Sequence, residues 1–335
     1  MTLTVGHVGA DVDLHHALED LKIGRYHAAR DLLNRACWNW PLYTSRTQLL
    51  AAGDGAAGVI KTWLDEEPHN PHALVMWARA LTRTAVVAHH ADTRPELVSR
   101  AASLAQQACG TAIGQAPLSP VPWIDLLRLT QLPYDPALFD PYASQRPVPW
   151  ALLSDPGMPH RGPWPLLHEI NHRHLGSREG HHRMREYFLH RMSPGTAEDF
   201  SCWLVMGQVD NPELLLLPLY ALMDVYRRRH GDGKGGAHQF WQAGRISGYA
   251  LRAYDEWFDK IQPSEYAWVP LADLSHLAFT LVACGEEARA RAVFEAMGPY
   301  TTAEPWRTVN ASLGRSADWR NEFVRTRASV LRRRR

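Results

Sequence analysis

The sequence of 335 residues is poor in lysine, and it has no long apolar run. Only four of its 36 basic residues are lysines. The most apolar window, Leu214–Leu222, is half the length of the roughly 18 residues that a membrane-spanning helix needs, so we expect no membrane partner. The N-terminus lacks a basic segment followed by an apolar one, so we expect no secretory signal. The predicted location is the cytoplasm.

Cysteine is also scarce, and the motifs of several enzyme classes are missing. The four cysteines, Cys37, Cys109, Cys202 and Cys284, are widely separated and form no C-x-x-C pair, which favours free thiols packed as small apolar side chains. The chain has no G-x-S-x-G motif and no spaced pair of carboxylates typical of acid–base catalysis. We therefore expect a protein without catalytic activity and without a cofactor.

The formal net charge is only +1, which gives no general electrostatic reason to bind nucleic acid. The C-terminal segment 318–335 differs, because it contains seven arginines and only two acidic residues. Its last residues, Arg332, Arg333, Arg334 and Arg335, are candidates for contact with an acidic polymer or nucleic acid. The alternative is that they complement a helix dipole and keep the end of the chain hydrated. No nucleic-acid-binding motif supports the first interpretation, so nucleic acid is not the expected partner.

The apolar residues that make up 45% of the chain recur with helical spacing from Asp13 onward. One stripe contains Leu14, Ala17 and Leu21, and a second contains Ala29, Leu33 and Ala36, with Gly24 between them. The string G-R-Y-H-A-A-R-D-L-L-N-R-A, which begins at Gly24, resembles the second half of a tetratricopeptide repeat. The segments Leu271–Ala283 and Glu286–Met297 carry a second such signature, with Gly285, Ala290 and Phe294 at matching positions.

Further helices are predicted along most of the chain, and no segment shows convincing strand alternation. The expected ranges are 46–67 as a looser hairpin, 72–84, 96–113, 123–129, 166–172, 178–191, 197–206, 213–229 and 237–260. Between Pro117 and Pro165 lie 12 of the 23 prolines, which helix interiors do not tolerate, so residues 132–162 are predicted to be a connector.

The predicted fold is therefore all-α, with stacked antiparallel helical hairpins forming an α-solenoid that the Pro-rich connector interrupts. The expected organisation is an N-terminal helical region at 1–131, the connector at 132–162 and a C-terminal helical region with a basic tail at 163–335. The segment 177–188, with the break at 210–212, also resembles divergent repeat proteins of no assigned activity. Such a family implies binding of a protein or peptide on a concave surface.

The string H-E-I-N-H at residues 168–172 matches the H-E-x-x-H pattern of zinc hydrolases. On a helix, His168 and His172 would face one side, and His174 could supply a third ligand, as could His181 or His182. Against this interpretation, the chain has 18 histidines, so a chance match is expected in roughly one such chain in twenty, and the polar residues Arg173 and His174 follow the string directly. A half-exposed helix surface without metal is the favoured interpretation, and a metal-dependent hydrolase or metalloprotein is the alternative.

The helix predicted at 178–191 is the strongest candidate for partner contact. Periodicity directs Met184 and Phe188 to the core and leaves four basic residues to project elsewhere: Arg178, His182, Arg183 and Arg185. Either they form a cationic strip for a carboxylate or phosphate, or they belong to a solvated face with pairs within the helix. Taken together, the sequence predicts a non-catalytic scaffold that binds an unidentified protein or peptide, and it leaves the oligomeric state open.

Overall fold

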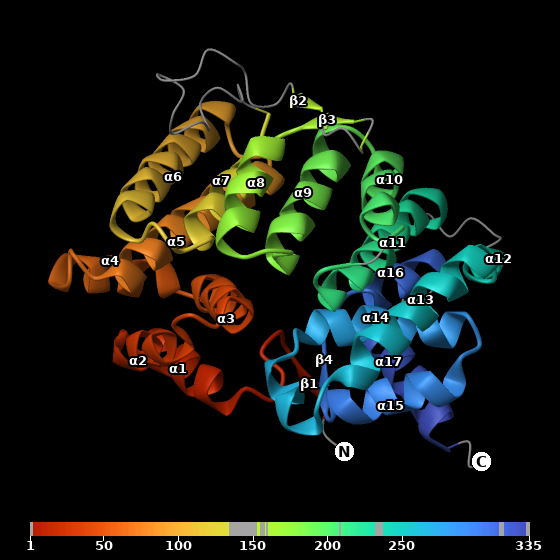
Figure 1. The fold of residues 1–335 in the computed structure, drawn as a ribbon. Helices are drawn as coiled ribbons and strands as arrows, with labels where there is room; N and C mark the ends of the chain where they lie inside the picture. Colours follow the sequence, from red (N-terminus) through yellow and green to blue (C-terminus); the bar gives the residue numbers. More distant parts are fainter. Residues whose placement is uncertain are drawn as a thin grey trace. The chain divides into compact units, whose positions relative to one another are not determined.

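The computed structural model describes residues 3–133, 153–154, 158, 160–207, 209–231, 237–314 and 318–332. These residues are mostly helical, as the sequence predicts (Figure 1). The chain forms two compact units. One comprises Val12–Phe200, and the other comprises Met1–Asp11 together with Ser201–Arg335.

The unit of residues 12–200 consists of helices and one short strand pair. In chain order the elements are α1 (Val12–Lys22), α2 (His27–Ala36), α3 (Trp40–Ala52), α4 (Ala56–Glu66), α5 (Pro71–His90), α6 (Pro95–Gln115), α7 (Val121–Leu129), β2 (Leu153–Ser154), β3 (Arg161–Gly162), α8 (Trp164–Arg173), α9 (Arg178–Arg191) and α10 (Pro194–Leu204), the last of which crosses into the other unit. Strands β2 and β3 pair in antiparallel fashion.

Helices α1 and α2 pack on each other through the residues that the sequence pattern selects. Leu14, Ala17 and Leu21 on α1 are buried, and so are Ala29 and Ala36 on α2. The turn between the helices closes at Gly24, whose φ is 82°. Glycine adopts this left-handed conformation without steric cost, so the turn ends α1 sharply and lets α2 return along it.

The α5–α6 pair shows why small residues recur in this part of the chain. Each helix turns several alanines inward; the fully buried ones include Ala73, Ala78 and Ala85 on α5 and Ala105 and Ala112 on α6. Alanine side chains let two helix backbones approach closely, and close approach increases dispersion contact along the pair. Figure 1 shows α5, α6 and α7 side by side in orange and yellow.

Helices α8 and α9 pack on α7 in this unit. The division at Phe200 therefore differs from the predicted organisation, in which residues 163–335 form the second region. Arg173, the last residue of α8, contributes to this packing because its guanidinium lies 4.7 Å from the centre of the Trp123 ring and its Nε donates to the Pro117 carbonyl. Most of the predicted connector at 132–162 lies outside the described residues.

The second unit combines the N-terminal strand with the C-terminal helices. Its elements are β1 (Thr4–Val5), η3 (Pro212–Leu216), α11 (Leu217–His230), α12 (Ala237–Trp241), α13 (Gly244–Glu256), η4 (Phe258–Lys260), η5 (Pro263–Trp268), α14 (Leu271–Ala283), α15 (Glu287–Met297), β4 (Tyr300–Thr301), α16 (Trp306–Ser312) and α17 (Trp319–Arg332). Strand β1 pairs in parallel with β4, which ties the start of the chain to this unit. The single helix predicted at 237–260 is in fact α12, α13 and η4.

Helices α14 and α15 form the second predicted pair, and their turn closes at Gly285 with a φ of 83°. The core beside them is aromatic. Trp306 is buried and contacts three phenylalanine rings at centroid distances from 5.2 to 6.1 Å: Phe279, Phe294 and Phe323. Aromatic rings packed in this way fill the space between the helices.

The apolar window Leu214–Leu222 lies in η3 and α11, and most of its side chains are buried in this unit. Within the described parts of the chain, no helix combines the length and the apolar character that crossing a lipid bilayer requires.

Candidate functional site

The unit of residues 12–200 contains a cluster of buried charged side chains, which is the most unusual chemical feature of that unit. Helix α9 begins at Ser177, whose hydroxyl accepts a hydrogen bond from the Gly180 amide at 3.3 Å. From this start, Glu179, Arg183 and Glu186 recur at helical spacing and form one stripe. The stripe faces inward, because Glu179 and Arg183 are each about 5% exposed or less.

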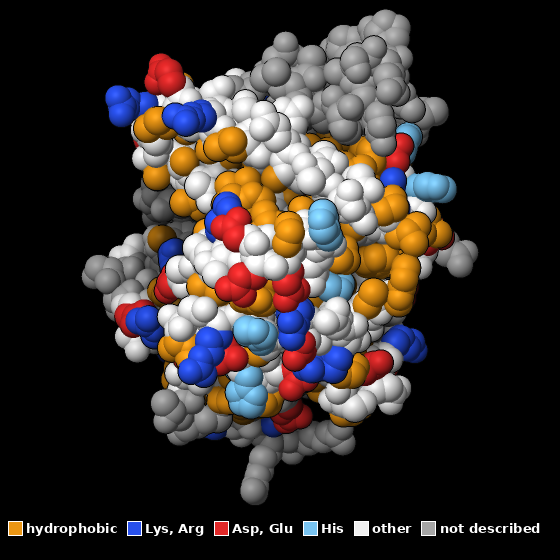
Figure 2. Space-filling model, turned by 90° about the vertical axis from the view of Figure 1, so that its left-hand side faces the viewer, with side chains coloured by type: hydrophobic (Ala, Val, Ile, Leu, Met, Phe, Trp, Pro, Cys, Tyr) orange, Lys and Arg blue, Asp and Glu red, His pale blue; other side chains and the backbone are white. Residues whose placement is uncertain are grey.

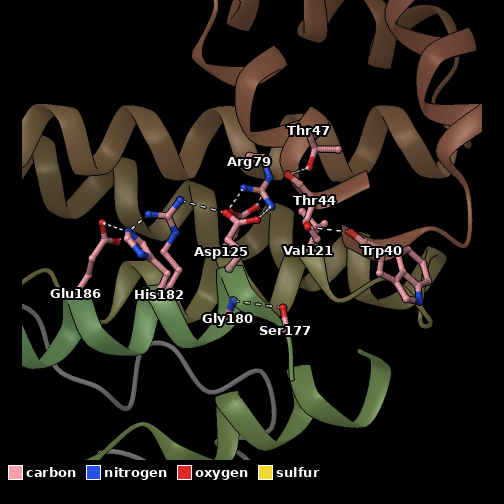
Figure 3. Close-up of polar contacts among 12 residues, drawn as sticks. Trp40, Thr44, Thr47, Arg79, Val121, Asp125, Ser177, Gly180, His182 and Glu186 are labelled. Atoms are coloured by element: carbon pink, nitrogen blue, oxygen red, sulfur yellow. Dashed lines mark hydrogen bonds and ion pairs between the residues drawn. The ribbon is translucent and has the colours of Figure 1, made fainter. Parts of the chain in front are cut away.

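Arg79 of α5 forms two hydrogen bonds to this stripe through the two terminal nitrogens of its guanidinium group. Its Nη1 donates to Glu179 Oε1 at 2.7 Å, and its Nη2 donates to Glu179 Oε2 at 3.1 Å. Arg183 donates to the same carboxylate at 3.1 Å and to Glu186 at 2.8 Å. Two arginines thus share Glu179 in a chain of ion pairs that joins α5 to α9. Figure 3 labels Arg79 and Asp125 in this cluster, with His182 and Glu186 of α9 beside them.

Asp125 of α7 also lies beside Arg79 but has a different environment. Its Oδ2 is 3.8 Å from Arg79 Nε, the side chain is fully buried, and neither carboxylate oxygen accepts a hydrogen bond from the residues that the structure describes. Burial therefore raises the pKa of Asp125 to about 6, although Arg79 acts in the opposite direction. Burial alone would also raise the pKa of Glu179, but Arg79 and Arg183 together lower it to about 2.

Two histidines of α9 complete the cluster as neutral side chains. His181 is buried, and its Nδ1 lies 2.8 Å from the Ser177 carbonyl oxygen; burial lowers its pKa to about 4. For His182, burial and then Arg185 lower the pKa to about 3, even though Glu186 lies 3.5 Å from its Nε2. Both imidazoles are therefore uncharged near neutral pH.

A carboxyl group with a pKa near 6 has the right acidity for proton transfer near neutral pH. Asp125, however, is fully buried, so a substrate does not reach it in this arrangement. The cluster is better explained by what it does for packing. A buried charge is costly unless a partner compensates it, so the ion pairs let α9 pack on α7 with these side chains turned inward.

The predicted partner-binding strip on α9 is largely not at the surface. Arg183 and Arg185 are each only 4% exposed, so the expectation that they project into solvent is wrong. Arg178 and His182 are half-buried. For Arg183 the reason is that two carboxylates of the same helix, Glu179 and Glu186, compensate its charge. A role of this helix in partner binding stays a prediction.

The basic C-terminus is described only in part. Arg332 is exposed at the end of α17, while Arg333, Arg334 and Arg335 lie outside the described residues. In the preceding turns of α17, two bonds tie the helix to α15: Arg291 donates to the carbonyl oxygens of Val330 and Leu331 at 2.7 and 3.0 Å. A contact of the tail with an acidic polymer stays a prediction.

The H-E-I-N-H string forms the second half of α8. His168 and His172 are exposed, and Glu169 is engaged by Arg173 of the same helix at 2.8 Å. His174 follows the end of the helix and is half-buried, which lowers its pKa. In the part of the chain that the structure describes, no group of three or more histidine, cysteine or acidic side chains is placed to hold a metal ion.

Arg79 and Asp125 are the members of the cluster that the sequence reasoning missed. A signal for Asp125 is present, because it is the single acid in the otherwise apolar start of α7, V-P-W-I-D-L-L. A lone carboxylate in such a run is costly unless it is paired, which indicates a buried partner. Its partner, Arg79, is separated by 46 positions, and no local pattern identifies it.

No protein-family model matches this chain, and the comparison with curated proteins finds no similar sequence.

Proposed function

We propose that this chain is a non-catalytic scaffold of the tetratricopeptide-like type, which binds a protein or peptide through exposed helix faces. Pairs of adjacent helices account for much of the chain, and the two signature pairs, α1–α2 and α14–α15, close through left-handed glycines at equivalent places. Such pairs bury their small-residue seams and leave their outer faces available for contact.

The observation that carries this proposal is an apolar stripe on the outer face of α6. Leu97 and Leu104 are seven residues apart, so they lie on one side of the helix, and each is nearly half exposed. Val87, near the end of α5, is also half exposed. Large apolar side chains gathered on a helix face favour a contact with another molecule, since burying them removes apolar surface from water.

Figure 2 shows the side of the molecule that carries α4 and α6 in Figure 1. On this face, exposed hydrophobic side chains lie among acidic and basic side chains, and the described residues form no broad field of one charge. This pattern favours a partner with a mixed apolar and polar surface over a uniformly charged polymer.

A cross-linking capture from extract of the native cells tests the proposal. The bait is the full chain with a photoreactive residue in place of Arg100, which is exposed on α6. We expect the wild-type surface to capture a specific partner, and the double variant Leu97→Glu/Leu104→Glu to lose it. The matched control is Leu118→Glu, which changes a leucine that is 58% exposed outside α6 and should leave capture unchanged.

Two results would contradict the proposal. One is that no protein is captured above the level of bait without irradiation. The other is that the charged double variant captures the same partner in the same yield as the wild type. Circular dichroism of each variant shows that it is folded before capture is compared.

A further inference from the structure

The turn between α2 and α3 holds a tryptophan in a backbone conformation that normally belongs to glycine. The Asn39 amide donates to the Ala36 carbonyl at 3.0 Å, and Cys37 has φ −53° and ψ 132°. Trp38 then has φ 73°, so the four residues form a type II turn with Trp38 at its third position. That position requires a positive φ, which the Cβ of a large side chain disfavours.

The same chain places glycine where other helices end in the left-handed conformation, at Gly24 and at Gly285. The other described non-glycine residue with a positive φ is Asp92, whose short polar side chain tolerates this conformation, so Trp38 is the bulky exception. Its side chain is also 67% exposed, so burial does not compensate for the strained backbone. A strained residue with an exposed aromatic ring indicates that the ring has a use outside the folding of the turn.

Trp38 is the outer end of a short aromatic series. Its ring lies 5.9 Å from the Trp40 ring, centre to centre, at 68°, and the Trp40 ring lies 5.7 Å from Tyr43 at 87°. Tyr43 is buried, and its hydroxyl is 2.9 Å from His72 Nδ1 on α5. The inner rings thus hold Trp40 in place, and Trp38 and Trp40 present two indoles inclined to each other at the surface.

We propose that this pair of indoles, the Trp38–Trp40 corner, binds a proline residue of a peptide ligand. This inference depends on the proposed peptide-binding function and names one of its surfaces. A prolyl ring is flat, apolar and rigid, and polyproline segments dock on aromatic side chains with little loss of conformational entropy. A strained but rigid Trp38 provides a ready-made face for such stacking.

The surrounding charge favours an uncharged ring over a cation. A cationic ligand would gain from uncompensated acidic groups beside the indoles. Arg35, three residues before Trp38, instead forms an ion pair with Asp13 at 3.2 Å, with both side chains more than half exposed. Asp13 is thus already paired with a base, and the aromatic rings supply the binding energy.

The test is a titration of the full chain, followed through the indole N–H signals in ¹⁵N-labelled protein. The probe is a blocked proline oligomer, and a glycine–serine oligomer of equal length is the control peptide. The signal of Trp38 is assigned as the one that disappears in Trp38→Gly. We expect the Trp38 and Trp40 signals to shift with the proline oligomer alone, and Trp38→Gly to bind it at least about tenfold more weakly.

Two comparisons protect the test from folding artefacts. Trp38→Gly should have a thermal unfolding midpoint no lower than that of the wild type, because glycine suits the turn. Trp268, which is 49% exposed on η5, is the matched reference whose signal should not move during the titration. A Trp38→Phe variant should keep part of the affinity, since it keeps an aromatic face.

Three outcomes would overturn the inference. The first is that millimolar proline oligomer shifts neither indole signal. The second is that tetramethylammonium shifts these signals more than the oligomer does, which would show that the Trp38–Trp40 corner binds cations. The third is that dilution of the protein alone shifts them, which would assign it to a second copy of the chain. If the titration fails while the α6 surface still captures its partner, only this inference is removed. If the capture experiment fails, the proposed function is removed.

Discussion

Replacing Glu179 by glutamine tests whether the buried ion pairs determine the packing of α9. The substitution keeps the shape of the side chain but removes the charge that Arg79 and Arg183 share at 2.7 to 3.1 Å. Both guanidinium groups then remain buried against a neutral amide. Losing one partner of a buried pair typically costs about 3 to 5 kcal/mol of unfolding free energy.

The pKa of Glu179 gives a second route to this magnitude. It falls from an ordinary value of 4.5 to about 2 in the folded protein. At roughly 1.4 kcal/mol per pKa unit, the folded environment favours the ionised form by about 3 kcal/mol. Because the folded pKa is depressed, this stabilisation is present above pH 4.5 and is lost as the pH falls toward 2.

The measurement is urea unfolding at pH 7, followed by circular dichroism at helix wavelengths. We expect Glu179→Gln to unfold at distinctly lower urea, and its stability to depend less on pH between 4.5 and 2. The double variant Arg79→Met/Glu179→Met should recover part of the loss, because it removes the unpaired charge at Arg79. The control is Glu19→Gln, which breaks the exposed pair with Lys22 and should have no measurable effect.

A result within about 0.5 kcal/mol of the wild type for Glu179→Gln would refute the reasoning, since surface substitutions have effects of that size. It would mean that α9 does not pack with these charges buried.

The remaining predictions concern neutral groups around the same helices. The pKa of His181 is lowered to about 4, so between pH 6.5 and 4 the unfolded chain binds more protons than the folded protein, and the free energy of unfolding should fall with pH. In His181→Gln, the slope of unfolding free energy against pH, measured by urea unfolding, should flatten by up to about 1.4 kcal/mol per pH unit. An unchanged slope would argue against a buried imidazole. Gly180→Ala should destabilise the protein by about 1 to 3 kcal/mol in thermal unfolding, because its Cβ would lie 2.8 Å from Ile170 Cγ2. The matched Gly110→Ala in α6 has open space and should gain about 0.5 to 1 kcal/mol; equal effects at both sites would contradict the packing. His168→Ala should leave the metal content of purified protein unchanged, and a stoichiometric metal lost in that variant would revive the metalloprotein alternative.

The positions of the helices could largely be predicted from the sequence, because the signals are local. Apolar residues at a spacing near 3.6 identify the buried stripes of α1 and α2, and Gly24 marks the turn between them. The same reasoning succeeds for α14 and α15. The reasoning fails at residues 237–260, where it predicts one helix in place of α12, α13 and η4. A change of direction within an apolar-rich segment depends on what the segment packs against, which the local sequence does not reveal.

Tertiary structure alone decided which charged residues are buried. Periodicity within α9 assigns Arg183 to the surface, because a single helix gives no information about partners elsewhere in the chain. Its own carboxylate partners, Glu179 and Glu186, lie on the same helix, but Glu179 is shared with Arg79, which α5 contributes a hundred positions earlier. Trp38 shows the same limit: its sequence neighbours do not reveal a left-handed backbone or an exposed ring. Local sequence determined where helices form, whereas the burial of charge depended on side chains that only folding brings together, since a charge leaves water only when another compensates it.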